Sequence, residues 1–155
     1  MKTLIAAAAC ALALAALPVA AVGPEPAYEK VALDAKVMFG SGSSRLSAAG
    51  RDALNLFLRS MYGLESRTVV AIGYADRMGS EASNRVLSEE RADAVKAYLV
   101  SRGLSAERVR TGARGAAEPE TRPDQCSGGS RADNVACLQP DRHVFIVVSG
   151  TRLAR

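Results

Sequence analysis

The stretch RTVVAIGYADRMGSEASNRVLSEERADAVKAYLV, residues 67–100, decides the fold. Its first part, Arg67 to Tyr74, carries apolar side chains on both faces. This pattern predicts an inner β-strand that is covered on both faces, or on one face with loops at its edges. A turn at Asp76 to Ser80 follows, and the next segment predicts a helix from about Glu81 to Arg102, which Gly103 ends. A strand, a short turn and a long helix form the repeating unit of α/β proteins.

The segments on either side of this unit supply further elements. Upstream, residues 31–39 predict a strand, and Ser47 is suited to cap a helix that extends to about Met61. Downstream, residues 109–111 predict a short strand and residues 142–149 a strongly apolar last strand. The order β-α-β-α-β-β predicts an α/β (α+β) sandwich, with two helices packed on one face of a small mixed sheet. The face expected to be apolar in the first helix contains Ala49, Ala53, Leu56, Phe57 and Met61.

The amino-terminal residues have the order of a secretory signal peptide. Lys2 precedes an almost unbroken apolar run at residues 4–17, and small residues lead to a cleavage position after Ala21. The run is short for a bilayer, which needs about 20 apolar residues, so a membrane anchor is the weaker alternative. The division that we expect is a signal peptide (1–21), a leader (22–30), one domain (31–150) and a tail (151–155).

Cys10 raises the alternative of a lipoprotein acylated at this cysteine. Three alanines before Cys10 make a poor lipobox, so we interpret Cys10 as part of the signal peptide. Cleavage removes Lys2 and lowers the formal net charge of +4 by one. Nothing further along the chain is apolar enough to span a membrane. We therefore expect the mature chain in the periplasm, either free or associated with the outer membrane.

The segment 112–141 is long and rich in Gly and Pro, and it is predicted to be irregular. A loop of about 30 residues is unusual in a compact domain, so a function or a disulfide must account for it. It contains Cys126 and Cys137, and an even pair in an exported chain indicates a disulfide, with two free thiols as the alternative. Closing this loop stabilises a fold by about 3 kcal/mol on chain-entropy arguments.

One charged residue lies on an apolar helix face. Arg91 follows Leu87 by four residues and precedes Val95 by four, so it shares their stripe. An unpaired buried charge costs several kcal/mol, and Arg91 must therefore find a carboxylate, solvent or an anionic ligand. Asp76 is a candidate neighbour at the end of the preceding strand. The pair could bind a zwitterion at a strand end, or form an internal salt bridge that only orients the loop.

The same segment resembles the OmpA-like family, the C-terminal domain of outer membrane protein A. The resemblance is carried by GYADRMGS (73–80), Asn84 and LSEERA (87–92), and it extends over roughly residues 31–149. It implies non-covalent binding of peptidoglycan through the diaminopimelate of the stem peptide, without a cofactor. Diaminopimelate offers an ammonium and a carboxylate on its side-chain end. The resemblance places five residues at this ligand: Asp76, Asn84, Arg91, Arg142 and Phe39.

The chain also departs from the family pattern. Ala75 stands where the family usually has Thr, and residues 39–42 read Phe-Gly-Ser-Gly where an aromatic and two polar side chains are usual. Arg142-His143 replaces a double Arg. These changes leave open a second hypothesis, a protein-interaction module on the same fold with weak or no wall binding.

Catalysis and nucleic-acid binding have little support. His143 is the only histidine, so neither a nucleophile–base pair nor a metal site can be assembled from the usual ligands. The basic residues of the second half lack the interleaved aromatics of a nucleic-acid surface. The expected partners are peptidoglycan and an outer-membrane or other envelope protein. The basic residues in question are Arg108, Arg110, Arg114, Arg122 and Arg131.

Overall fold

The computed structural model describes residues 27–36 and 38–152. The expected signal peptide, Cys10, most of the leader and the end of the tail lie outside these residues. Within the described residues, no helix combines the length and the apolar character that a bilayer crossing requires.

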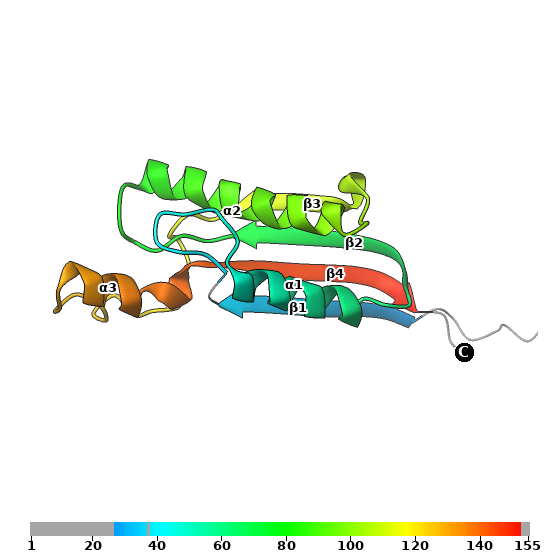
Figure 1. The fold of residues 1–155 in the computed structure, drawn as a ribbon, viewed down its shortest axis with the longest axis horizontal. Helices are drawn as coiled ribbons and strands as arrows, with labels where there is room; N and C mark the ends of the chain where they lie inside the picture. Colours follow the sequence, from blue (N-terminus) through cyan, green and yellow to red (C-terminus); the bar gives the residue numbers. More distant parts are fainter. Residues whose placement is uncertain (1–26, 37, 153–155) are drawn as a thin grey trace, which may run out of the picture.

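The described chain folds into a mixed four-stranded sheet with the order β1-β4-β2-β3. Strand β4 is antiparallel to both of its neighbours, whereas β3 runs parallel to β2. Helices α1 and α2 cover the same face of the sheet, and α3 lies beyond one end of it (Figure 1). The elements are β1 (Ala27–Lys36), α1 (Ala48–Ser60), β2 (Leu64–Gly73), α2 (Glu81–Ser101), η1 (Ala106–Arg108), β3 (Val109–Ala113), α3 (Arg131–Cys137), η2 (Gln139–Asp141) and β4 (His143–Arg152).

The predicted α+β sandwich is confirmed, whereas the predicted limits of its first strand are wrong. Strand β1 begins at Ala27, inside the expected leader, and it ends at Lys36. It pairs with β4 along its whole length, from Ala27 opposite Arg152 to Lys36 opposite His143. Pairing with a long partner strand, rather than local alternation, therefore sets its limits. Phe39 lies outside the strand and forms an isolated bridge with Leu46.

The core lies between the two helices and one face of the sheet. Val69 and Ala71 of β2 and Ile146 of β4 are fully buried there. On the opposite face Val70 is 37% exposed, and Ile72 is only partly buried. Strand β2 is thus covered on one face, which decides between the two alternatives that its sequence allowed.

The buried face of α1 agrees in part with the face expected from sequence, since Phe57 and Met61 are buried as predicted. Leu56 is 64% exposed, whereas Leu54 and Phe57 belong to the core. Ser47 caps the helix as predicted, since its hydroxyl accepts from the backbone N–H of Gly50 at 2.9 Å. Gly50 then lies against the backbone of Met38, because a Cβ atom there would be 3.1 Å from the Met38 Cα. Leu54 lies one turn after Gly50, so the close approach at Gly50 places Leu54 on the buried face as well.

A second close approach joins β2 to α2. A Cβ atom on Gly73 would lie 1.9 Å from the carbonyl oxygen of Ser88, so only glycine fits at this point. Ser80 caps α2 by accepting from the N–H of Ser83 at 3.1 Å. The contact at Gly73 fixes the middle of α2 directly over the end of β2, where the candidate site begins.

Candidate functional site

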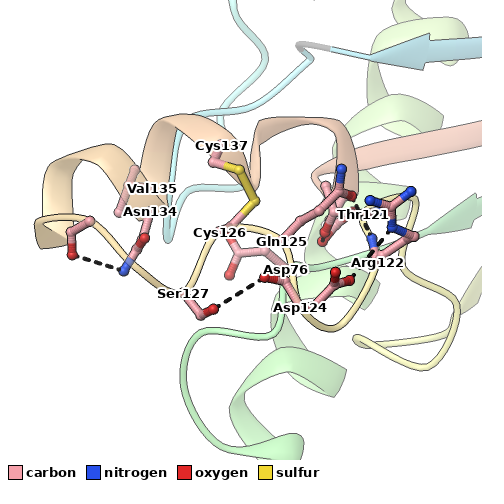
Figure 2. Close-up of a disulfide and its surroundings, with 12 residues drawn as sticks. Asp76, Thr121, Arg122, Asp124, Gln125, Cys126, Ser127, Asn134, Val135 and Cys137 are labelled. Atoms are coloured by element: carbon pink, nitrogen blue, oxygen red, sulfur yellow. Dashed lines mark hydrogen bonds and ion pairs between the residues drawn. A yellow bond between two sulfur atoms is a disulfide. The ribbon is translucent and has the colours of Figure 1, made fainter.

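The segment predicted to be irregular contains a short helix, α3. Ser130 caps it in a capping box: its hydroxyl accepts from the N–H of Asp133, and the Asp133 carboxylate accepts from the N–H of Ser130. The prediction of a wholly irregular segment was therefore wrong. The disulfide between Cys126 and Cys137 is present and joins the end of α3 to the preceding loop (Figure 2).

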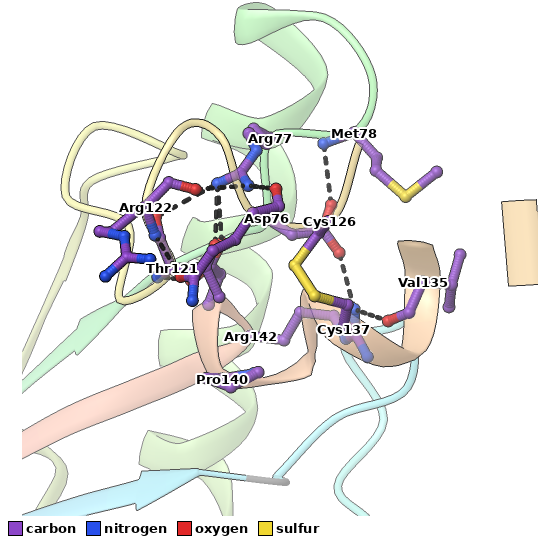
Figure 3. A network of polar contacts seen from close by, with 12 residues as sticks. Asp76, Arg77, Met78, Thr121, Arg122, Cys126, Val135, Cys137, Pro140 and Arg142 are labelled. Carbon is purple, nitrogen blue, oxygen red and sulfur yellow. Dashed lines mark hydrogen bonds and ion pairs between the residues drawn. A yellow bond between two sulfur atoms is a disulfide. The ribbon is translucent and has the colours of Figure 1, made fainter. Parts of the chain in front are cut away.

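A buried ion pair lies between the end of β2 and the start of β4. The Asp76 carboxylate accepts from Nη1 of Arg142 at 3.0 Å and from the backbone N–H of Met78 at 3.0 Å. The same Nη1 donates to the carbonyl oxygen of Val135 in α3 at 2.9 Å. Arg142 therefore links the turn after β2 to the disulfide-bonded helix (Figure 3). Its Nε is buried without a hydrogen-bond partner.

A second network fixes the loop that leads to α3. Arg77 donates from Nη1 to the hydroxyl of Thr121 at 2.8 Å and lies 3.6 Å from the Asp141 carboxylate. Asp141 in turn accepts from both the N–H and the hydroxyl of Thr121 at 2.8 Å. Nη2 of Arg77 donates to the carbonyl oxygens of Arg122 and Gln125. These bonds leave little freedom in a segment without regular structure.

Arg91 is fully buried, with an exposed fraction of 0%. Its guanidinium donates to three backbone carbonyl oxygens, those of Gly40 at 3.1 Å, Ser43 at 3.0 Å and Tyr74 at 2.9 Å. It also lies over the ring of Phe39, 5.3 Å from the centroid. The internal Asp76–Arg91 salt bridge considered from sequence is absent, because the carboxylate pairs with Arg142.

The buried charges around Asp76 do not balance. One carboxylate, Asp76, faces two guanidinium groups, Arg91 and Arg142, so the cluster has an excess of one positive charge. Burial lowers the pKa of Arg91 from its ordinary value to about 10. The Asp76 charge opposes this shift, and Arg142 adds to it. An anionic group near the cluster would relieve the excess.

A cavity of about 420 Å³ opens beside this cluster. Its walls come from four segments that are distant in sequence: the loop before α1, the turn after β2, the first turns of α2, and the start of α3. Asp76 and Asn84 line it, together with Arg131 from α3. The lining residues are Ser41, Gly42, Asp76, Met78, Gly79, Ser83, Asn84, Leu87 and Arg131.

Asn84 has the character of a ligand-binding side chain. It is 4% exposed, yet within the described residues its side-chain amide makes no hydrogen bond. It lines the cavity beside Asp76 and also a larger adjoining groove of about 820 Å³. A side-chain amide that lines a cavity and makes no hydrogen bond to the described residues is available to hydrogen-bond a ligand, as a donor through its NH₂ group and as an acceptor through its oxygen.

The residues predicted from sequence therefore divide into two groups. Asp76 and Asn84 line the cavity, whereas Arg91, Arg142 and Phe39 are buried and do not. Arg131 lines the cavity as well, although its sequence context predicted no place for it at the site. A signal was available, because Ser130 followed three residues later by Asp133 is the spacing of a capping box.

His143 is buried. Its ring stacks on Tyr74 with centroids 4.5 Å apart, and its Nδ1 donates to the carbonyl oxygen of Pro140 at 3.0 Å. Both contacts are structural. Among the described residues, no group of three or more His, Cys, Asp or Glu side chains could hold a metal ion.

The fold and the site define a class: an α+β sandwich domain with a charged cavity at the carboxyl end of its second strand. The profile described as "OmpA family" matches residues 38–135. The chain belongs to this family. The match contains β2, α2 and all the residues that line the cavity.

Two curated relatives align over 88% of this chain. Outer membrane protein A of Yersinia pseudotuberculosis serotype I is 36% identical over 142 residues, which cover 40% of its length. Outer membrane protein P5 of Haemophilus influenzae is 38% identical over 139 residues, or 38% of its length. The chain thus corresponds to about two fifths of these relatives.

Solved structures agree with the fold. The OmpA-like domain of FopA1 from Francisella tularensis superposes with a TM-score of 0.61 at 26% identity, over 83% of this chain and 78% of that one. The peptidoglycan-associated lipoprotein from Burkholderia pseudomallei has a TM-score of 0.56 at 21% identity, over 72% and 87% of the two chains. The second likeness concerns the fold alone.

Proposed function

We propose that this chain binds peptidoglycan non-covalently through the diaminopimelate of the stem peptide, as a cell-wall anchoring module of the periplasm. The observation that carries the proposal is the cavity beside Asp76, in a chain of the OmpA family. Its wall holds a carboxylate and an unpaired amide, which suit the ammonium of a zwitterionic ligand.

Asp76 has acceptor capacity left for a ligand. An ionised carboxylate offers about four lone-pair positions, and two are taken by Arg142 and the N–H of Met78. Arg142 holds the carboxylate in place, and Asn84 supplies a further hydrogen-bonding group on the same wall. The side chains are thus fixed before the ligand arrives, which lowers the entropy cost of binding.

Direct contact of Arg91, Arg142 and Phe39 with the ligand stays a prediction. The Arg91 guanidinium already donates hydrogen bonds to the carbonyl oxygens of Gly40 and Ser43, which belong to the loop before α1. Ligand contact by Arg91 would require this loop to move. Without such movement Arg91 and Arg142 position Asp76 and keep the cavity electropositive.

We assign the site a binding role and no catalytic one. The only histidine is engaged in stacking on Tyr74 and in a bond to Pro140, so it is not poised as a general base. The carboxylates of the two networks are held by arginine and threonine groups, which favours stable recognition.

Co-sedimentation with purified sacculi of the diaminopimelate type tests the proposal. Ser83→Trp fills the cavity from an exposed position on α2 without touching the buried charges. Ala97→Trp places the same ring on an exposed position further along the helix and serves as its control. We expect the wild type and Ala97→Trp to pellet with sacculi, and Ser83→Trp to remain in the supernatant. Wild-type protein that stays in the supernatant would refute wall binding.

The alternative is a protein-interaction module on the same fold, and one observation favours it. The loop before α1 lacks the usual polar side chains and lies on Arg91 through backbone carbonyl groups. If sacculi do not retain the chain, this face is the one to test against envelope proteins.

A further inference from the structure

We propose that the face of the sheet opposite α1 and α2 binds a second copy of this chain, so that two molecules pack sheet to sheet in opposite directions. This inference goes beyond the proposed function and does not depend on it. The surface shares no residue with the lining of the cavity beside Asp76, so that cavity stays open in the pair.

The outward face of the two central strands is apolar. Val70 and Ile72 of β2 pair with Val147 and Phe145 of β4. Val70 is exposed and the other three are partly buried; these four residues are called the sheet patch. Helices α1 and α2 lie on the opposite face and α3 lies beyond one end of the sheet, so no helix of the described chain covers the patch (Figure 1).

The sequence of these strands is that of strands covered on both faces. A sheet with one face in water normally alternates apolar and polar side chains along each antiparallel strand. In β4, however, residues 144–148 are all apolar, and β2 is apolar on both faces from residue 69 to residue 72. Contiguous exposed apolar patches mark interaction sites, because covering them removes apolar surface from water. We therefore expect a partner to cover the sheet patch.

The charges at the two ends of the patch have opposite signs. Arg110 of β3 pairs with Val70, and its side chain lies on the outward face because the preceding residue belongs to the core. It is exposed, and its guanidinium makes no hydrogen bond or ion pair with the described residues. At the other end, the Glu118 carboxylate accepts from the Tyr74 hydroxyl at 3.4 Å and lines a pocket of about 440 Å³ that borders the patch. The ion pair of Glu118 with Arg114 is exposed on both sides and therefore weak.

This distribution of charge makes the face complementary to itself. Ile72 lies midway between Val70, which pairs with Arg110, and Tyr74, which contacts Glu118. A two-fold axis over Ile72, at right angles to the strands and in the plane of the interface, reverses the second sheet. Each Arg110 then faces the Glu118 of the other molecule, and the two sheet patches pack on each other. The alternative with both sheets in the same direction brings like charges together, which is unfavourable.

Sedimentation equilibrium of the purified mature chain, over about a hundredfold range of concentration, tests the proposal. Val70→Glu places a charge in the sheet patch, and Val86→Glu makes the same change at an exposed position of α2 as its control. We expect the wild type and Val86→Glu to form dimers and Val70→Glu to stay monomeric. Arg110→Glu should raise the dimer dissociation constant at least about tenfold, whereas Arg59→Glu, at an exposed position of α1, should not change it. Adding Glu118→Arg to Arg110→Glu should restore the dimer, because both charges are then reversed.

Several outcomes would overturn the proposal. A wild-type chain that is monomeric over the whole range does not pair, and dimers of Val70→Glu would place the contact on another face. If the double charge reversal weakens the dimer further than Arg110→Glu alone, the antiparallel arrangement is wrong. Circular dichroism confirms that each variant is folded. If Val70→Glu does not fold, the charge reversals at Arg110 and Glu118 decide, because both side chains are exposed.

Discussion

Replacing Asp76 with alanine is the sharpest test of the buried cluster. The change leaves the guanidinium groups of Arg91 and Arg142 without an opposing carboxylate, and it also removes the acceptor for the N–H of Met78. The side chains of Asp76 and Arg142 are 8% and 5% exposed, so the pair is almost fully removed from bulk solvent. Breaking a buried pair by removing one partner costs about 3–5 kcal/mol.

Urea denaturation followed by circular dichroism measures this cost as a shift of the midpoint at constant slope. Asp124→Ala is the matched control, because it breaks an ion pair with Arg122 in which both side chains are more than 70% exposed. Exposed pairs contribute about 0–1 kcal/mol. We also expect the double variant Asp76→Leu/Arg142→Met to be more stable than Asp76→Ala, since it leaves one buried charge fewer unpaired. A cost of Asp76→Ala no larger than that of Asp124→Ala would refute the reasoning.

Three further predictions concern the core, the disulfide and a titrating group. Leu54→Ala should lower the free energy of unfolding in urea by about 2–5 kcal/mol, and Leu56→Ala by less than about 0.5 kcal/mol. The reason is that only the Leu54 side chain is buried. Equal effects of the two changes would contradict the assigned face of α1. Replacing Cys126 and Cys137 together by serine should cost about 3 kcal/mol, and an unchanged unfolding midpoint would argue against the bond. Burial, then the charge of Glu118, raises the pKa of Tyr74 above 10.0; the difference in phenolate absorbance between the wild type and Tyr74→Phe should therefore titrate above pH 10. The folded state holds this proton more tightly, so Tyr74 contributes stability below pH 10 that is lost as the pH rises through its raised pKa; a difference curve centred at or below pH 10 would contradict the burial.

Local signals predicted most of the fold correctly. The apolar alternation of β2 and the capping residue Ser47 depend on neighbours in sequence, and α1 and α2 appear within a residue or two of their predicted limits. The limits of β1 depend on its pairing with β4, more than 100 residues away in the chain, so local alternation could not define them. The buried face of α1 depends on the approach of Gly50 to Met38, which is also a tertiary contact.

The candidate site was predicted only in part, again because some of its contacts join residues that are distant in sequence. Spacing placed Arg91 on an apolar face and Asp76 at a strand end, and both are buried together near the cavity. The partner of Asp76, however, is Arg142, which is 66 residues further along the chain. Backbone carbonyl oxygens of the loop before α1 accept hydrogen bonds from Arg91. Because every residue has a backbone carbonyl group, the sequence does not show which of them will accept. Arg131 reaches the cavity only because α3 folds back across it.

The central claim is that the cavity beside Asp76 is where a diaminopimelate stem peptide binds. Nuclear magnetic resonance of the isotope-labelled chain, titrated with a soluble diaminopimelate muropeptide, tests it most directly. The account predicts that the perturbed backbone amides are those of the cavity wall, in particular Ser41, Met78, Gly79, Ser83 and Asn84. Perturbations on another face of the sheet, or none at saturating muropeptide, would contradict it.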